Sequence, residues 1–151
     1  MKILFATDGA KQSDAAAEML GHFALSDGDE VKIVSVVDMA VPMAIDIYGG
    51  YLPDTGELEK TARENAAKLL ERTEERIKNH FPGKNLAISS EVLFGSPESR
   101  IVETAEATHP DLIVLGSHGY SRWERLLLGS VSDSVVHHAP CSVLIVRTPA
   151  E

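Results

Sequence analysis

Three glycines followed by hydroxyl side chains are the residues of this chain best suited to bind a phosphate group. Gly116, Gly119 and Gly129 lie in one segment, and two serines follow the last glycine within the range 130–132. Glycine lets a backbone approach a ligand closely, because it has no side chain in the way. The N-terminus of a helix adds unpaired N–H groups and a positive dipole end. The segment therefore predicts a phosphate-binding loop between a strand and a helix.

The spacing of these glycines excludes two common phosphate-binding motifs. A P-loop requires G-x4-G-K-[ST], and no lysine occurs between Gly116 and Ser132. The dinucleotide fingerprint requires G-x-G-x-x-G, which the observed pattern G-x2-G-x9-G-S does not match. Spacing alone leaves two interpretations open. The glycines either bind phosphate or only allow a turn and a helix start.

The segments around this loop alternate between strand and helix patterns. Buried strands are predicted at 2–7, 31–37 and 111–115, a more alternating strand nearer an edge at 86–94, and a last apolar strand, also at an edge, at 142–147. Helices are predicted at 14–25 with Ser13 as the cap, and at 57–79, 97–108 and 130–138. Residues 38–56, which hold several glycines and prolines, are predicted to form a long loop. The inner faces expected for the first two helices consist of Ala16, Met19, Leu20 and Phe23, and of Leu58, Ala62, Ala66, Leu69, Leu70, Thr73 and Ile77.

This alternation predicts one α/β domain over residues 1–151, with a parallel sheet covered by helices on both faces. In such sheets, ligands bind at the carboxyl ends of the strands where the strand order reverses. Asp8 follows the first predicted strand, and Gly116 follows the fourth. If these two strands are neighbours, the carboxylate and the glycine loop flank one crevice.

The composition excludes several classes of protein. The formal net charge of −9 argues against sequence-independent nucleic-acid binding, which needs a basic face. No apolar stretch approaches the roughly 18 residues of a membrane span. The single cysteine, Cys141, excludes an internal disulfide and fits a reducing cytoplasm. The hydrophobic content of 44% is ordinary for a globular domain with its own core.

In these motifs the chain resembles the universal stress proteins. The ATP-binding members of that family carry G-x2-G-x9-G-[ST] after their fourth strand, and this chain has the whole pattern. The opening ILFATDG at 3–9, VSVVD at 34–38 and VLIVR at 143–147 resemble the family's first, second and last strands. The resemblance implies a five-stranded parallel sheet in the order 3-2-1-4-5, of the Rossmann-like, adenine nucleotide alpha hydrolase-like type. It also implies ATP between the first and fourth strands, and a homodimer.

Carried over by position, the resemblance implies a role for each residue of an ATP site. Asp8 would contact the adenosine moiety of ATP, and the ribose is the favoured partner. Asp8 is also a candidate ligand for magnesium. Ala6 and Val36 would line the base pocket, while Leu115 and Gly116 would pass close to the ribose and α-phosphate. The phosphates would be held by Gly119, Gly129, Ser130, Val131 and Ser132.

This chain departs from the family pattern at two positions. The family often has proline or valine where Ala6 stands, which slightly reshapes the expected base pocket. It often has a serine near Ala10, and losing that serine removes a polar contact or helix cap.

Other polar residues near the loop have weaker patterns. His118 is a candidate general acid or base, but the sequence offers no partner to orient it. Arg122 and Arg125 are candidate γ-phosphate ligands, although the simpler interpretation is that they are solvated surface residues. His137 and His138 are adjacent on a predicted helix, so they diverge and make a poor metal site.

Three functions fit these residues. The leading hypothesis is a cytoplasmic, homodimeric, ATP-binding regulatory protein in the stress response, with nucleotide occupancy tuning conformation or partner binding. The dimer is expected to form through the strand residues Val143–Val146. The alternative is a slow ATP hydrolase, or a transferase of phosphate or adenylate. The lack of a P-loop lysine and of a positioned base argues against this alternative. The third is an interaction protein with the same fold and no nucleotide.

Overall fold

In a computed structural model that describes residues 1–38, 55–117 and 128–148, strands and helices alternate along these parts of the chain. The strands are β1 (Lys2–Ala6), β2 (Glu30–Val37), β3 (Ala87–Phe94), β4 (Leu112–Gly116) and β5 (Ser142–Val146). The helices are α1 (Lys11–Leu20), α2 (Thr55–His80), α3 (Pro97–Thr108) and α4 (Ser130–His138). No helix in these ranges is long and apolar enough to cross a membrane.

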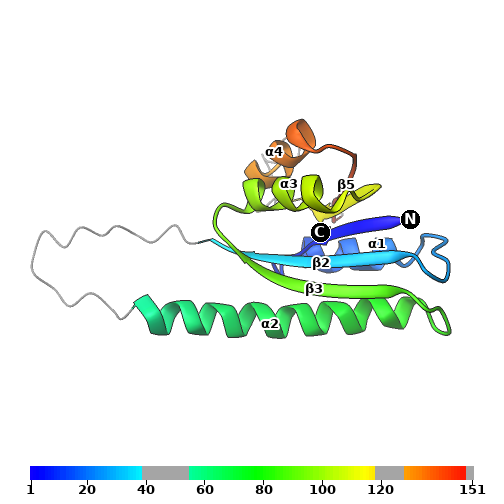
Figure 1. Cartoon of the computed structure of the whole chain (residues 1–151), viewed down its shortest axis with the longest axis horizontal. Coiled ribbons are helices and arrows are strands. Elements are labelled where there is room, and N and C mark those ends of the chain that lie inside the picture. The colour runs from blue at the N-terminus through cyan, green and yellow to red at the C-terminus, as the bar shows by residue number, and fades with distance from the viewer. Residues whose placement is uncertain (39–54, 118–127, 149–151) are drawn as a thin grey trace, which may run out of the picture.

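The five strands form one parallel sheet in the order β3-β2-β1-β4-β5, which confirms the predicted fold class (Figure 1). From β1 the chain first builds toward β2 and β3, and it then crosses back to build β4 and β5 on the other side. The order therefore reverses between β1 and β4. At this point Ala6 of β1 pairs with Val34 of β2 on one side and Leu115 of β4 on the other.

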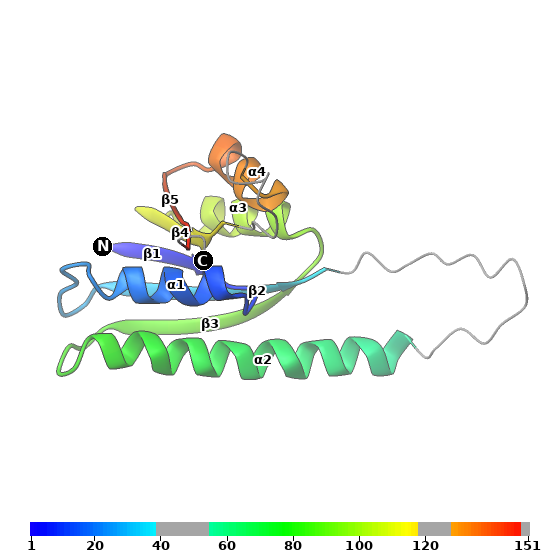
Figure 2. The same cartoon turned by 180° about the vertical axis from the view of Figure 1, so that it is seen from behind.

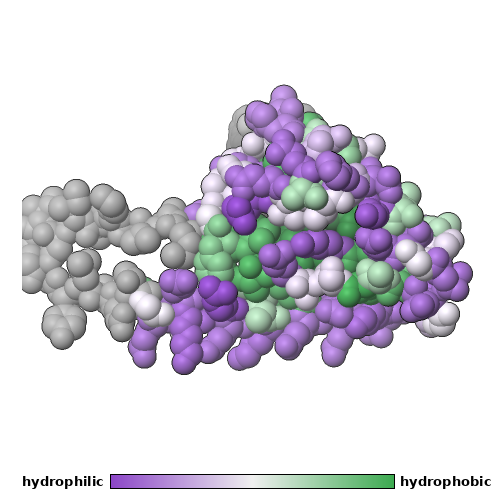
Figure 3. Space-filling view, in the orientation of Figure 1, coloured by the Kyte–Doolittle hydropathy of each residue, from purple (hydrophilic) through white to green (hydrophobic). Residues whose placement is uncertain are grey.

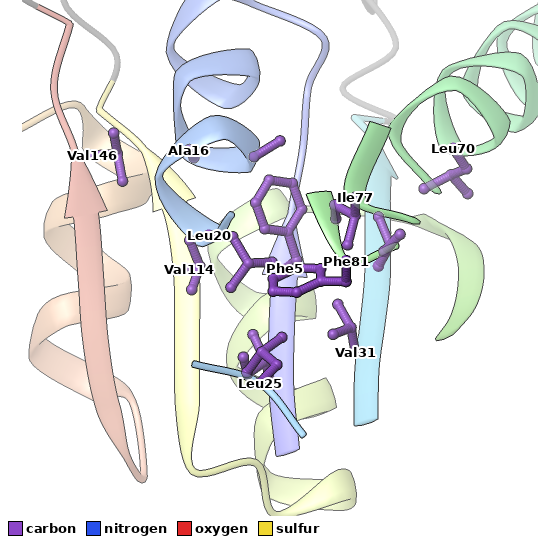
Figure 4. Close-up of a cluster of buried hydrophobic side chains, with 13 residues drawn as sticks. Phe5, Ala16, Leu20, Leu25, Val31, Leu70, Ile77, Phe81, Val114 and Val146 are labelled. Carbon is purple, nitrogen blue, oxygen red and sulfur yellow. The ribbon is translucent and has the colours of Figure 1, made fainter. Parts of the chain in front are cut away.

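The two faces of the sheet are covered by different helix pairs. Helices α1 and α2 run along the same side of the sheet (Figure 2), and Phe5 of β1 packs there among Leu20, Ile77 and Phe81 (Figure 4). Helices α3 and α4 cover the opposite face. Their buried contacts with the sheet include Leu4, Ile101, Ile113 and Val135.

The structure corrects the predicted bounds of α1. This helix was expected at 14–25 with Ser13 as its cap, but it begins at Lys11 after the N-cap residue Ala10 and ends at Leu20. The earlier start follows from the turn at Asp8, whose Oδ1 accepts a hydrogen bond from the Ala10 N–H at 3.0 Å. The earlier end falls at Gly21, where a Cβ atom would lie 2.7 Å from the His80 ring.

The predicted inner faces of α1 and α2 are confirmed at most positions and are wrong at Met19 and Leu58. Ala66, Leu70 and Ile77 are buried, whereas Leu58 at the start of α2 is 58% exposed and Met19 near the end of α1 is 44% exposed. Helix α2, with 26 residues, is about 39 Å long, while the eight residues of β3 span about 26 Å. The first turns of α2 therefore extend past the end of the sheet (Figure 1).

Replacing Ile77 with Ala should lower the free energy of unfolding by about 2–5 kcal/mol, because a fully buried side chain is lost from the core. The matched control on the same helix is Leu58→Ala, which should change that free energy by no more than about 0.5 kcal/mol. Urea denaturation followed by circular dichroism measures both. Equal losses for the two variants would contradict this packing of α2.

Candidate functional site

A pocket of about 260 Å³ opens at the carboxyl ends of the strands, where the strand order reverses between β1 and β4. Seven of the residues predicted from the sequence lie in its wall. They are Ala6, Asp8, Val36, Leu115, Gly116, Val131 and Ser132. Gly129 and Ser130 stand at the start of α4 but do not line this pocket, and Gly119 lies outside the described residues.

One part of the pocket is apolar. Val34 and Val36 come from β2, Leu115 from β4, and Ile101 from α3. Parallel strands that are buried on both faces carry apolar residues at most positions, so this wall is a continuation of the core. In Figure 3 apolar surface lies open at this end of the sheet, between the polar outer faces of α2 and α3. A flat apolar group, such as a purine ring, suits such a wall.

The other part of the pocket carries a carboxylate that is held in place by its neighbours. The Ser13 hydroxyl donates a hydrogen bond to Asp8 Oδ1 at 2.5 Å, and the Ala10 N–H donates to the same oxygen at 3.0 Å. The Asp8 N–H in turn donates to Ser13 Oγ at 3.3 Å. Ser13 is therefore not the helix cap predicted from the sequence. Its side chain is 5% exposed and lines the pocket beside Asp8.

Three helices begin at this pocket. Ser13 belongs to the first turn of α1, Pro97 to that of α3, and Ser132 to that of α4. Their N-cap residues accept no hydrogen bond from these turns through their side chains within the described part of the chain. Each helix start therefore presents N–H groups and a partial positive charge. Together they favour an anionic ligand.

The N-cap residue of α3 is Ser96, and its side chain binds another side chain in the first turn of the helix. The Ser96 hydroxyl hydrogen-bonds to the Glu98 carboxylate rather than to a backbone N–H. With the backbone N–H of Glu98, this bond lowers the pKa of Glu98 below its usual value. Glu98 follows Pro97 in the chain and stays ionised at neutral pH, but it does not line the pocket.

Gly116 is required by the packing of α1 as well as by its place in the pocket. A Cβ atom at this position would lie 2.5 Å from the backbone carbonyl carbon of Gln12 and 2.7 Å from the backbone nitrogen of Ser13. Backbone atoms of a helix cannot move aside as a flexible side chain can. This packing accounts for Gly116 without a ligand, and its role in binding stays a prediction.

Five residues of the pocket were not predicted from the sequence to belong to a binding site. Thr7 and Val34 had detectable signals, since Thr7 adjoins Asp8 and Val34 alternates with Val36 on the same face of its strand. Pro97 and Ile101 are spaced by one helical turn, but only the docking of α3 brings them to β1 and β4. The complete set comprises Thr7, Ser13, Val34, Pro97 and Ile101.

The remaining candidates for chemistry lie elsewhere or are engaged. His118, Arg122 and Arg125 lie outside the described residues. The rings of His137 and His138 each place Nδ1 2.8 Å from a backbone carbonyl of α4. Burial raises the pKa of the Cys141 thiol, which keeps it protonated and a weak nucleophile at neutral pH. In the described ranges, no group of three or more His, Cys, Asp and Glu side chains is arranged to hold a metal ion.

Gly116→Ala should destabilise the protein by about 3 kcal/mol and loosen α1, because the new methyl group meets helix backbone. The control is Gly28→Ala, where a Cβ atom meets nothing within 4 Å and only the φ of +86° opposes a side chain. That strain should cost about 1 kcal/mol. Hydrogen exchange of the α1 amides should accelerate in the first variant alone. Unchanged α1 protection in Gly116→Ala would refute the contact.

Comparison with known proteins places the whole chain in one family. The profile of the universal stress protein family matches residues 1–147. Universal stress protein MJ0531 of Methanocaldococcus jannaschii is 34% identical over 148 residues, which are 98% of this chain and 82% of that protein. The solved structure of hypothetical protein MJ0577 superposes with a TM-score of 0.80 at 25% identity, covering 99% of this chain and 97% of the other. A universal stress protein in complex with cAMP has a TM-score of 0.66 at 24% identity, with 99% and 98% coverage. This chain belongs to the universal stress protein family.

Proposed function

We propose that this protein binds an adenine nucleotide, specifically ATP, in the pocket between β1 and β4, and that occupancy regulates its conformation or partners. The observation that carries the proposal is the pocket itself, which joins an apolar wall, a fixed carboxylate and three helix starts. These three features match the base, the sugar and the phosphates of a nucleotide. The cytoplasm is the expected location, because the single cysteine fits a reducing compartment.

Each part of the nucleotide has a counterpart in the pocket. The base would pack on the apolar side chains of Val34, Val36 and Ile101. The Asp8 carboxylate accepts hydrogen bonds only, so it suits the hydroxyl donors of the ribose. The phosphates would lie toward the start of α4, where N–H groups and the hydroxyl groups of Ser130 and Ser132 favour negative charge. Magnesium that arrives with ATP would offset the negative charge of the phosphates.

The size of the pocket and one relative support this assignment. A volume of about 260 Å³ is near the lower end of small-molecule sites, roughly 300 Å³, and it suits a nucleoside whose phosphates extend toward the pocket mouth. The solved relative in complex with cAMP carries a ligand that contains adenine, ribose and phosphate. ATP rather than a smaller adenine nucleotide is favoured by the glycine segment that ends in Gly129-Ser130.

ATP should raise the melting temperature of the purified protein and change the emission of Trp123, the single tryptophan, which lies within the glycine segment of the sequence. At 100 times its dissociation constant, a ligand stabilises by about 2.7 kcal/mol. For a chain of this length that corresponds to roughly 5–10 °C. Val131→Phe should abolish both responses, since the larger ring fills the pocket.

Val136→Phe is the matched control for this experiment. Val136 lies on the same helix, is 44% exposed and does not line the pocket, so ATP should still stabilise the variant. Mass spectrometry of any nucleotide that co-purifies separates ATP from AMP or cAMP. The proposal fails if saturating ATP moves neither signal in the unsubstituted protein and no nucleotide co-purifies.

The homodimer is part of the same proposal. Strand β5 is an edge of the sheet, and its apolar residues Val143, Leu144 and Ile145 are only partly buried within a single chain. An edge strand of this kind favours pairing with another chain. Light scattering at micromolar concentration should report a dimer, and Val143→Lys should shift it toward monomer by placing a charge on the edge. A monomer in the unsubstituted protein would disprove this interface.

A further inference from the structure

Ser13 has a buried hydroxyl that the helix does not need. The residue is 5% exposed and occupies the third position of α1, in the first turn, where the backbone N–H groups have no partner within the helix. The hydroxyl instead points to Asp8 and donates to Oδ1 at 2.5 Å. A hydrogen bond from a hydroxyl to a carboxylate belongs to the charge-assisted class, which is stronger than a bond between two neutral groups.

Ser13 and Asp8 each donate a hydrogen bond to the other. The Asp8 N–H donates to Ser13 Oγ at 3.3 Å, while the Ala10 N–H donates to Asp8 Oδ1 at 3.0 Å. These bonds restrain both the backbone and the side chain of a residue that is otherwise exposed. A carboxylate held in one orientation loses less conformational freedom when a ligand binds to it.

The position of Ser13 is itself fixed by β4. The backbone nitrogen of Ser13 is one of the atoms that a Cβ at Gly116 would approach to within 2.7 Å. The end of β4 therefore sets the place of Ser13, and Ser13 sets the orientation of Asp8 after β1. The side chains of Ser13 and Asp8 both line the pocket.

We propose that Ser13 is a positioning residue, which holds the Asp8 carboxylate so that it accepts hydrogen bonds from the ribose hydroxyls of the nucleotide. The inference rests on the proposed function, because it requires a nucleotide in this pocket. It goes further by assigning the preference for a ribose with free hydroxyls to the Ser13–Asp8 pair. Ser13 acts on the ligand through Asp8 and not through the base or the phosphates.

Isothermal titration calorimetry with ATP and with 2′,3′-dideoxy-ATP tests the proposal. The unsubstituted protein should prefer ATP. Ser13→Ala, and Ser13→Cys with its near-equal volume and weak donor, should each reduce the affinity for ATP about tenfold. Neither should change the affinity for the dideoxy nucleotide. Ser13→Thr keeps the hydroxyl and should retain the preference for ATP.

Two further variants separate positioning from general loss of structure. Ser35→Ala removes an equally buried hydroxyl, also 5% exposed, that does not line the pocket, and it should leave both affinities unchanged. Asp8→Asn should weaken ATP binding, and the double variant with Ser13→Ala should bind no more weakly than Asp8→Asn alone, because the two residues act as a unit. If Ser13→Ala does not fold, Ser13→Cys provides the same comparison.

The possible results are distinguishable. Failure of the unsubstituted protein to bind either nucleotide overturns the proposed function and this inference with it. Binding with an undiminished preference for ATP in Ser13→Ala and Ser13→Cys overturns the inference and leaves the proposed function standing. Equal affinity of the unsubstituted protein for ATP and the dideoxy nucleotide also overturns it. A preference for ATP that is lost in both variants and retained in Ser13→Thr supports it.

Discussion

The first turn of α1 packs directly on the backbone of β4, and this contact exists because residue 116 has no side chain. Gly116 brings the backbone of Gln12 and Ser13 against the end of β4, where a single methyl group would be 2.5 Å from the nearest atom. Since α1 follows β1 after a short turn, the same contact holds the Asp8 turn beside β4. The pocket between these two strands depends on that approach.

The pocket combines the two physical environments that the fold produces. Its apolar wall is the outer end of the core between the sheet and α3, and Ala6, Val34 and Leu115 belong to both. Its polar part lies where helices begin, because every helix that follows a parallel strand starts at the carboxyl end of the sheet. Asp8 lies between these environments. A ligand with an apolar ring and an anionic tail matches this arrangement.

The predicted interior of the elements agrees with the structure better than their ends do. The strands and α3 fall within one or two residues of their predicted bounds, since apolar runs and the Ser96-Pro97 start are local signals. Helix α1 was displaced because Asp8 initiates its first turn and Gly21 packs on His80. Leu58 fits the helical period of the inner face of α2, yet it is exposed because the first turns of α2 extend past the end of the sheet. The end of α1 at Gly21 and the exposure of Leu58 depend on where distant elements lie, whereas the start of α1 depends on the local hydrogen bond from the Ala10 N–H to Asp8.

Three features could be predicted from the residues alone: the alternation of strands and helices, a glycine segment suited to phosphate, and a carboxylate after the first strand. These follow from side-chain type and period, which are properties of neighbouring residues. Two other features follow only from how the elements pack: the Ser13 hydroxyl binds Asp8 rather than capping the helix, and Pro97 and Ile101 complete the wall of the pocket. The reason is that strand order and helix docking set which strand ends meet, and spacing along the chain does not encode those distances.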